Sequence, residues 1–173
     1  MNTVSIEQAE FRHALGHFAS GVTVITTYHQ GQPHGSTVSS FCSLSLDPPL
    51  ILVSIDLRAT LHDLIAESGS FAVNILSEQA EALSRHFARH TPDKFSGVPY
   101  TPGTFGLPLL HEALAQLECR LVNRYPGGDH AIFIGEVIAT HTRSDRQPLL
   151  YYRSSYGRLE ADARERLIVA SVE

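Results

Sequence analysis

The amino-acid sequence predicts a mainly β protein with a few short helices, whose antiparallel strands form a closed or split barrel of Greek-key type. Three observations indicate this class. β-branched and aromatic segments of strand length recur along the 173 residues, turns rich in Gly and Pro separate them, and only three segments have helical periodicity. The length suits one domain over residues 1–173, with six or seven strands in meander order.

The first predicted element is a helix that begins with a capping box formed by Ser5 and Gln8. Apolar residues then recur at helical spacing, namely Phe11, Ala14, Leu15 and Phe18. We expect Gly21 to end this helix, because glycine commonly follows the last helical turn. The next segment, 22–28, is rich in β-branched residues and predicts a strand.

Residues 29–35 contain two glycines and a proline, and this composition predicts a turn between antiparallel strands. The following segment, 36–46, is rich in serine and other small residues. It leads into the apolar run 50–55, whose length and composition predict a strand in the centre of a sheet.

Two further helices are predicted from their capping residues. Thr60 and Asp63 form a capping box for a short helix that Gly69 ends, and the apolar segment 71–76 then predicts a strand. Ser77 is expected to cap the third helix. One face of that helix carries Ala80, Leu83, Ser84 and Phe87.

The second half of the chain begins with a long irregular loop over 91–108, which contains four prolines and three glycines. Two long strands are then predicted over 114–125 and 131–142. The sequence Pro-Gly-Gly-Asp at 126–129 indicates a hairpin turn between them. Residues 149–152 predict a last strand before a polar tail.

Composition excludes several classes of protein. The net charge of −5 disfavours nucleic acid as a partner, because phosphates require a basic face. Neither a signal peptide nor an apolar run long enough to span a membrane is present, so no membrane partner is expected. The two cysteines, Cys42 and Cys119, fit reduced thiols in a cytoplasmic protein.

Several familiar motifs are absent from the sequence. It contains no G-x-G-x-x-G dinucleotide fingerprint, Walker lysine loop, G-x-S-x-G elbow or H-E-x-x-H motif. The pairs His13/His17 and His86/His90 have the i, i+4 spacing that can hold a metal, but neither has a third ligand nearby in sequence. No metal site is therefore expected.

Two polar segments are candidates for binding a cofactor. Hydroxyls and backbone N–H groups in segment 36–41 could bind the edge of a planar heterocycle and stabilise negative charge on it, although a Ser/Thr-rich edge strand has the same composition. Segment 54–60 joins a buried strand to a helix N-terminus and contains Arg58. Such a junction suits a phosphate, although a simple capped helix with a solvated arginine remains the alternative.

Two further features lie near the C-terminus. His130 follows a Gly-Gly-Asp turn that does not itself require histidine, and an imidazole there can bind a carboxamide or phosphate or fill a structural role. Residues 151–156 combine three tyrosines with Arg153. Such a cluster could cover a ring system or form a plain edge strand.

Taken in order, these segments resemble the flavin reductase-like family, the short NAD(P)H:flavin reductase components of two-component flavin-dependent monooxygenases. The resemblance covers about residues 11–159, which we take as the core of the domain. Its marks are Phe18–Thr27, Ser36–Phe41, Ser43–Leu50, Phe71–Leu76, Gly128-Asp129-His130 and Gly135-Glu136-Val137. The resemblance implies an FMN-binding split β-barrel that acts as a cytoplasmic homodimer, with FMN or FAD near the subunit interface.

The resemblance also implies roles for particular residues. The flavin ring is expected to contact Thr37, Val38, Ser39 and Ser40. The ribityl and phosphate end is expected at Ser54, Asp56, Arg58, Ala59 and Thr60. Lys94 is expected near the phosphate or the adenine, together with Phe87 of the preceding Phe-Ala pair. The nicotinamide is expected near His130, with contributions from Tyr152, Arg153 and Tyr156.

The implied reaction is the reduction of FMN or FAD by NADH or NADPH, with hydride passing from nicotinamide C4 to flavin N5. His130 would orient the nicotinamide rather than transfer a proton. Reduced flavin would then diffuse to a separate monooxygenase. Two alternatives remain: a carrier or sensor that holds FMN tightly without nicotinamide turnover, and an oxidase acting on a small amine such as a pyridoxine phosphate. The choices between FMN and FAD and between NADH and NADPH stay open, as does the identity of the monooxygenase.

Overall fold

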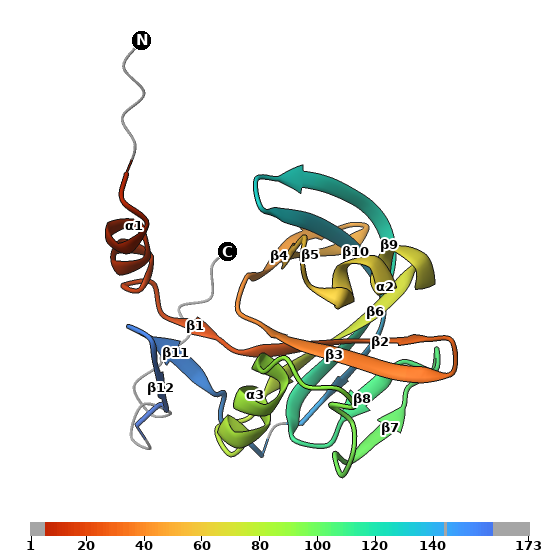
Figure 1. Ribbon diagram of the computed structural model, residues 1–173. Coiled ribbons are helices and arrows are strands. Elements are labelled where there is room, and N and C mark those ends of the chain that lie inside the picture. The colour runs from red at the N-terminus through yellow and green to blue at the C-terminus, as the bar shows by residue number, and fades with distance from the viewer. Residues whose placement is uncertain (1–5, 144, 161–173) are drawn as a thin grey trace.

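The computed structural model describes residues 6–143 and 145–160, and most of its regular structure is β-strand (Figure 1). Seven strands form the main sheet: β2 (Thr23–His29), β3 (Gln32–Val38), β4 (Phe41–Leu46), β5 (Pro49–Asp56), β6 (Ser70–Leu76), β9 (Ala113–Gly127) and β10 (His130–Thr142). They are hydrogen-bonded in the order β3-β2-β6-β9-β10-β5-β4, and every neighbouring pair is antiparallel.

Smaller elements complete the described chain. The strands β1 (Ser20–Gly21), β11 (Leu150–Tyr152) and β12 (Ser155–Gly157) form a three-stranded sheet, and β7 (Tyr100–Pro102) pairs with β8 (Pro108–Leu110). The helices are α1 (Gln8–Leu15), α2 (Thr60–Ser68) and α3 (Glu81–Ala88). The mainly β, antiparallel class with three short helices is confirmed.

The prediction of meander order is wrong. After β5 the chain passes through α2 and re-enters the sheet as β6, which lies between β2 and β9 rather than beside β5. Local alternation of apolar residues identifies strands but carries no information on which strands pair. The two ends of the sheet, β3 and β4, are not paired by backbone hydrogen bonds in the described structure.

The main core lies between the sheet and α2. Ile25, Val53, Phe71 and Phe133 from four strands are fully buried there and pack with Ile65 of α2. Burial along β5 alternates, so Ile51, Val53 and Ile55 face this core while its even-numbered residues are only half-buried. The apolar run 50–55 is therefore a strand with one buried face, paired on one side to β10 and on the other to the end strand β4.

The first helix differs from its prediction at both ends. α1 begins at Gln8 after Glu7, which makes no side-chain cap, and Ser5 lies outside the described residues. The helix ends at Leu15 rather than near Gly21, because Ser20 and Gly21 pair as β1 with Tyr151 and Leu150. That pairing joins distant parts of the chain, so no local pattern could have indicated it.

Both predicted caps of the later helices are also wrong. Ala59 is the residue before α2, Thr60 is already helical, and Asp63 contacts His62 instead of the helix N-terminus. α3 begins at Glu81, and the hydroxyl of Ser77 is buried with no hydrogen-bond partner in the described part of the chain. The end of α2 is confirmed: Gly69 has a left-handed conformation with φ of 69°.

The predicted loops contain more strand than expected. The turn at 29–35 is reduced to Gln30 and Gly31, because 32–35 already belong to β3. The predicted loop 91–108 contains β7 and the first residue of β8. β12 lies beyond the last strand predicted at 149–152, in the segment 151–156 for which an edge strand was one of two interpretations. The hairpin turn between β9 and β10 is confirmed, with Gly128 at φ of 71°.

The two cysteines differ in exposure. Cys42 is exposed on β4, whereas Cys119 is fully buried in the main core, where burial and the neighbouring Glu118 raise its thiol pKa to about 12. Because the thiolate is the reactive form, we expect iodoacetamide at pH 8 to leave Cys119 unmodified in the folded protein and to modify it in urea. Peptide mass spectrometry would measure this. Equal modification of Cys119 with and without urea would contradict the burial.

None of the described helices is long and apolar enough to span a membrane.

Candidate functional site

The link between β3 and β4 consists of Ser39 and Ser40, both exposed. The Ser40 hydroxyl donates to the Ser54 carbonyl (2.9 Å), and the Ser54 N–H donates to the Ser40 carbonyl (3.1 Å). These bonds attach the link to β5, so that three of the predicted site residues lie together. Among the described residues, the Ser39 side chain has no hydrogen-bond partner, so its hydroxyl is available to a ligand.

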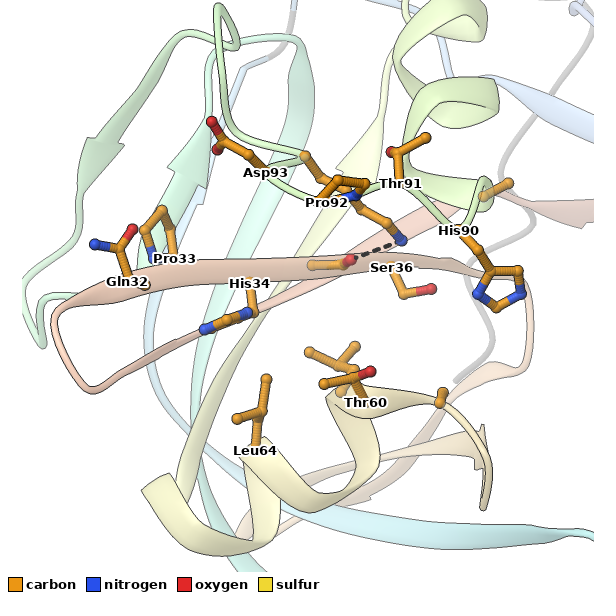
Figure 2. Close-up of a pocket in the computed structure, with 15 residues that line it drawn as sticks. Gln32, Pro33, His34, Ser36, Thr60, Leu64, His90, Thr91, Pro92 and Asp93 are labelled. Carbon is orange, nitrogen blue, oxygen red and sulfur yellow. Dashed lines mark hydrogen bonds between the residues drawn. The ribbon is translucent and has the colours of Figure 1, made fainter.

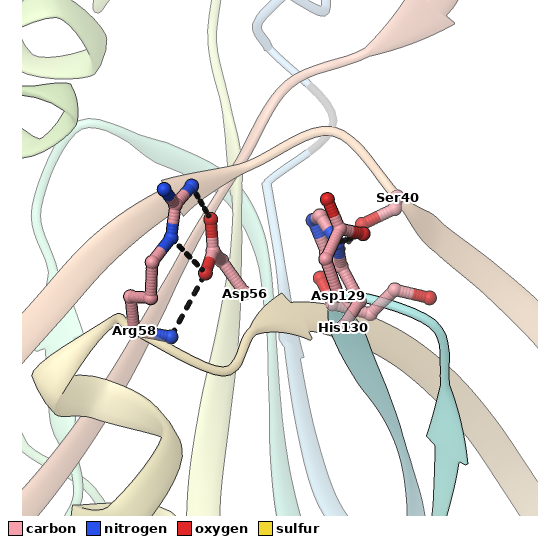
Figure 3. Close-up of polar contacts among 6 residues, drawn as sticks. Ser40, Asp56, Arg58, Asp129 and His130 are labelled. Carbon is pink, nitrogen blue, oxygen red and sulfur yellow. Dashed lines mark hydrogen bonds and ion pairs between the residues drawn. The ribbon is translucent and has the colours of Figure 1, made fainter.

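At the end of β5, Arg58 folds back onto Asp56 (Figure 3). The carboxylate accepts hydrogen bonds from the Arg58 backbone N–H (2.8 Å), Nε (3.1 Å) and Nη2 (2.7 Å). These bonds hold the pKa of the Asp56 carboxyl far below its usual value and raise that of Arg58. Arg58 is thus already engaged by a carboxylate, a contact that would compete with the phosphate contact predicted for it.

His130 begins β10 directly opposite Asp56 in the strand register. Its Nδ1 lies 2.7 Å from Oδ1 of Asp129, and this hydrogen bond lowers the pKa of the Asp129 carboxyl. Figure 3 shows the Asp129–His130 pair beside Ser40. The imidazole is partly exposed, at 43% of its side chain, so one ring nitrogen is held by the carboxylate while the other can meet a ligand.

A groove of about 570 Å³ lies between β3, the start of α2 and the segment 88–94 (Figure 2). Three predicted site residues line it: Ala59, Thr60 and Lys94. Arg58 is not among its lining residues, so the structure divides the predicted phosphate segment between the groove and the Asp56 cluster. The volume falls within the range of small-molecule sites.

Lys94 supplies the positive charge in the groove. Its ammonium donates to the carbonyls of Phe87 (2.8 Å) and Gly35 (3.3 Å), and partial burial lowers its pKa. An ammonium has three donors, so one remains for an anion in the groove. The first turn of α2 contributes helix N–H groups that lack intrahelical partners on the opposite wall.

Phe87 has no exposed surface, and it does not line the groove. A Cβ on Gly35 would meet its ring at 2.9 Å, so Phe87 supports the β3 wall from beneath. The prediction of a direct cofactor contact from Phe87 therefore does not fit the structure. Helical periodicity placed this side chain on the buried face of α3, and its burial follows from that position.

The tyrosine-rich segment forms part of the separate three-stranded sheet. Tyr156 donates or accepts a hydrogen bond with Ser84 of α3 (2.8 Å), and Thr37 donates to the Ser84 carbonyl (2.7 Å). Ser84, which the sequence did not single out as a site residue, thus connects Tyr156 to the predicted ring-binding strand. Val38, next in that strand, accepts from Thr23 (2.6 Å).

Tyr152 and Arg153 lie farther from these groups. The Arg153 guanidinium stands 5.3 Å from the Tyr152 ring centroid, and its backbone N–H donates to Gly16 (2.9 Å) at the end of α1. Neither residue lines the groove. Within the described residues of a single chain, Tyr152 and Arg153 do not lie with the other predicted site residues.

Ser36 of the candidate segment 36–41 also lines the groove, together with residues that were not proposed as cofactor contacts, namely Gln32, Pro33, His34, Leu64 and His90. His34 is the most informative of these, because partial burial and the nearby His29 lower its pKa. The expected turn at 29–35 concealed this wall, since its residues are in fact part of an edge strand. Among the described residues no cluster of His, Cys, Asp and Glu could hold a metal ion.

The groove contains Lys94 and several hydroxyls, which suit a phosphorylated ligand. The exposed Ser39–Ser40 link lies beside His130, whose imidazole is held by Asp129, and it offers hydrogen-bond donors to a planar ring. On an antiparallel sheet, these features define a cofactor-binding protein of the mainly β class. A family model described as "Flavin reductase like domain" matches residues 15–160, and the chain belongs to this family. The family and the class of enzyme implied by the sequence resemblance, a flavin oxidoreductase, are confirmed.

Named relatives agree with this assignment. The chain is 41% identical over 152 residues to the reductase component of 4-nitrophenol 4-monooxygenase/4-nitrocatechol 2-monooxygenase from Rhodococcus opacus, covering 88% of this chain and 81% of the relative. It is 37% identical over 164 residues to an NADH-dependent FAD reductase from Streptomyces globisporus, covering 92% and 90%.

Solved structures share the fold. A homologue of nitrilotriacetate monooxygenase component B from Mycobacterium thermoresistibile superimposes with a TM-score of 0.86 at 40% identity, over 88% of this chain and 87% of that one. The NADH:FAD oxidoreductase of Streptomyces globisporus C-1027, solved with NAD and FAD fragments, gives 0.87 at 38% identity, over 91% and 95%.

Proposed function

We propose that this protein is a cytoplasmic NAD(P)H-dependent flavin reductase that reduces FMN or FAD and releases reduced flavin to a partner monooxygenase. The observation that carries the proposal is the placement of the Ser39–Ser40 link, which joins the two end strands and is hydrogen-bonded to β5, the strand that pairs with His130 of β10. The groove lies along β3, the end strand that leads into this link. The names of the relatives, which include NADH-dependent flavin reductases and reductase components of monooxygenases, support it.

The two cofactors supply the chemistry, a hydride transfer from nicotinamide C4 to flavin N5. The residues of this chain bind the two cofactors and orient them toward each other. The Ser39 hydroxyl and the backbone of the Ser39–Ser40 link offer donors to the polar edge of the flavin ring, where charge develops on reduction. Lys94 and Thr60 hold the phosphate end in the groove. His130 orients the nicotinamide, with Asp129 fixing the imidazole.

The experiment that tests the proposal mixes purified protein with NADH or NADPH and excess FMN or FAD in air, and follows the nicotinamide absorbance. Oxidation that depends on added flavin is the expected result. Retention of FMN through gel filtration, with no oxidation of either nicotinamide, would instead identify a carrier or sensor and overturn the proposal.

Replacing His130 by alanine should raise the KM for NADH about tenfold and leave kcat nearly unchanged, because loss of one orienting hydrogen bond weakens binding by about 1.4 kcal/mol. Steady-state kinetics with saturating flavin measures both constants. The matched control is His111→Ala, because His111 is an exposed histidine in the turn between β8 and β9, outside the proposed site. A loss of kcat with unchanged KM would exclude the orienting role.

The proposal includes a homodimer. α1 buries none of its residues; Phe11 and Leu15 of this helix and Phe18, which follows it, expose 54%, 57% and 80% of their surface. Exposed apolar stripes of this kind commonly mark protein–protein contacts. Light scattering on the purified protein is expected to give the mass of two chains, and a monomer at micromolar concentration would contradict the homodimer.

The same proposal covers a split barrel formed by a single domain over residues 1–173. β3 and β4, the two ends of the main sheet, are consecutive in the chain and are joined only by Ser39 and Ser40. The ends of the sheet therefore approach each other at the link proposed to contact the flavin ring, which would place the ring at the split.

A further inference from the structure

The two histidines at the end of α3, His86 and His90, have different surroundings. His90 is exposed and lines the groove, whereas His86 is half-buried and does not line it. The Nε2 atom of His86 lies 2.7 Å from the carbonyl oxygen of Lys94. Because a carbonyl only accepts hydrogen bonds, His86 carries a proton on Nε2 and donates it. His86 therefore contacts the lysine that supplies the positive charge of the groove, but not the groove itself.

Lys94 makes a second contact with the same helix through its side chain. Its ammonium donates to the Phe87 carbonyl (2.8 Å), which is one of the last carbonyls of α3 and has no partner within the helix. The helix dipole also favours a cation at this end. The side chain of His86 thus binds the backbone of Lys94, and the side chain of Lys94 binds the backbone of the residue after His86. We call this pair of contacts the α3–Lys94 clamp.

The segment between the two ends of the clamp has little other support. Residues 89–93 are all exposed, and those from 90 to 93 form one wall of the groove (Figure 2). Within the described chain, residues 90–92 make no hydrogen bond to other residues. Asp93 has φ of 50°, a conformation that residues other than glycine rarely adopt. The position of this wall therefore depends on how its two ends are held.

Two contacts hold the Lys94 end. Phe95 is buried, and its ring centroid lies 5.2 Å from that of Phe87. This packing fixes where the chain returns to the protein, while the hydrogen bond from His86 fixes the direction of the peptide group between Lys94 and Phe95. Loss of the His86 contact should therefore turn this peptide group without unfolding the segment.

The direction of the Lys94 ammonium depends on this backbone. Two of its three donors are bound to the carbonyls of Phe87 and Gly35, which belong to α3 and β3. The third donor can point to an anion in the groove only if the Lys94 side chain starts from the right place. A hydrogen bond behind a binding residue serves to keep that residue within about 0.5 Å of its binding geometry.

We propose that His86 is a positioning residue for ligand binding, which holds the Lys94 ammonium toward the anionic group of a ligand in the groove. The inference rests on the proposed function, because it takes this anion to be the flavin phosphate. His86 does not line the groove, so its effect passes through Lys94. Its removal should therefore weaken only ligands that carry the phosphate.

The first measurement compares FMN with riboflavin, which has the same ring and ribityl chain but no phosphate. Titration of the purified protein, followed by flavin fluorescence, gives a dissociation constant for each. In His86→Ala the constant for FMN is expected to rise about fivefold, the usual effect of one lost hydrogen bond, and that for riboflavin to stay unchanged. Equal weakening of both flavins would indicate a merely structural role and would overturn the proposal.

Two conservative variants separate the hydrogen bond from the bulk of the side chain. His86→Gln places an amide nitrogen at the same reach as Nε2 and should keep FMN binding within about twofold of the wild type. His86→Asn places its amide nitrogen at the shorter reach of Nδ1 and should resemble His86→Ala. His111→Ala, at an exposed histidine outside the groove, is the matched control. Circular dichroism of each variant checks that folding is retained, and a folded His86→Gln as weak as His86→Ala would contradict the hydrogen bond.

A double-mutant cycle tests whether the effect passes through Lys94. Lys94→Met should weaken FMN more than His86→Ala does, because it removes the charge itself. In the Lys94→Met background, His86→Ala should cause no further loss of FMN affinity. Strictly additive losses would mean that His86 acts on the ligand by another route, and they would overturn the proposal.

Failure of this inference and failure of the proposed function give different results. Flavin-dependent NADH oxidation by the wild type, with unchanged FMN affinity in His86→Ala, would refute the positioning role and leave the reductase standing. Selective weakening of FMN in His86→Ala, with no nicotinamide oxidation by the wild type, would refute the reductase and support the positioning role.

Discussion

Replacing Asn74 by leucine is expected to lower the free energy of unfolding by about 3 kcal/mol, because buried polar groups would lose their partners. Asn74 lies on β6 with no exposed surface. Its Nδ2 donates to the Val24 carbonyl (3.1 Å) and the Thr26 hydroxyl (3.1 Å), and its Oδ1 accepts from the Leu110 N–H (2.8 Å). One side chain thus joins β6 to β2 and β8, and leucine would leave the Leu110 N–H unpaired.

Urea unfolding at a fixed protein concentration measures this change, because the stability of the proposed homodimer would depend on that concentration. Asn123→Leu, at an exposed position on β9, is the matched control and should stay within about 0.5 kcal/mol of the wild type. A loss below about 1 kcal/mol for Asn74→Leu would show that the buried N–H finds another partner.

Replacing Gly135 by alanine should cost about 2–3 kcal/mol through overpacking of the main core. A Cβ there would lie 2.6 Å from Cζ of Phe71 and 2.9 Å from Cβ of Cys119. Gly135 also sits at a register shift between β9 and β10, where the strands already depart from regular pairing. The Cys119 Cβ is fixed to the backbone, so the contact cannot be relieved by rotating a side chain.

A double-mutant cycle separates this contact from a general effect of losing glycine. Gly21→Ala, at a position with nothing within 4 Å, is the control and should change the free energy of unfolding by less than about 0.5 kcal/mol. Phe71→Leu removes the nearest ring atom and should recover part of the cost in combination with Gly135→Ala. Strict additivity of the two substitutions would contradict the proposed clash.

Five strands of the main sheet, β2, β5, β6, β9 and β10, could be predicted from sequence because a local pattern of residues indicates each of them, whereas β3 and β4 were not predicted as strands. The β-branched run of β2, the apolar run of β5 and the glycine turn before β10 all gave elements within a few residues of their observed bounds. Family resemblance, carried by short motifs in a fixed order, identified the class of protein. Both kinds of signal depend only on neighbouring residues and their order.

Helix caps and loop contents were less predictable. Thr60 and Ser77 have the right chemistry for capping, but tertiary packing displaced the helix starts and assigned Asp63 to His62. The glycines and proline of 29–35 indicated a turn, whereas only Gln30 and Gly31 form it, because pairing with β2 extends the strand. Turn-forming residues tolerate an edge strand when its outer side needs no partner strand.

The sequence by itself determined the mainly β class, the positions of most strands, the family and the residues of the Ser39–Ser40 link, Asp129–His130 and Lys94. Only the tertiary structure decided that His34 lines the same groove as Lys94 and that Ser84 connects Tyr156 to Thr37. The physical reason is that these two outcomes depend on contacts between residues distant in the chain. Strand pairing sets such contacts, and local sequence patterns do not encode it.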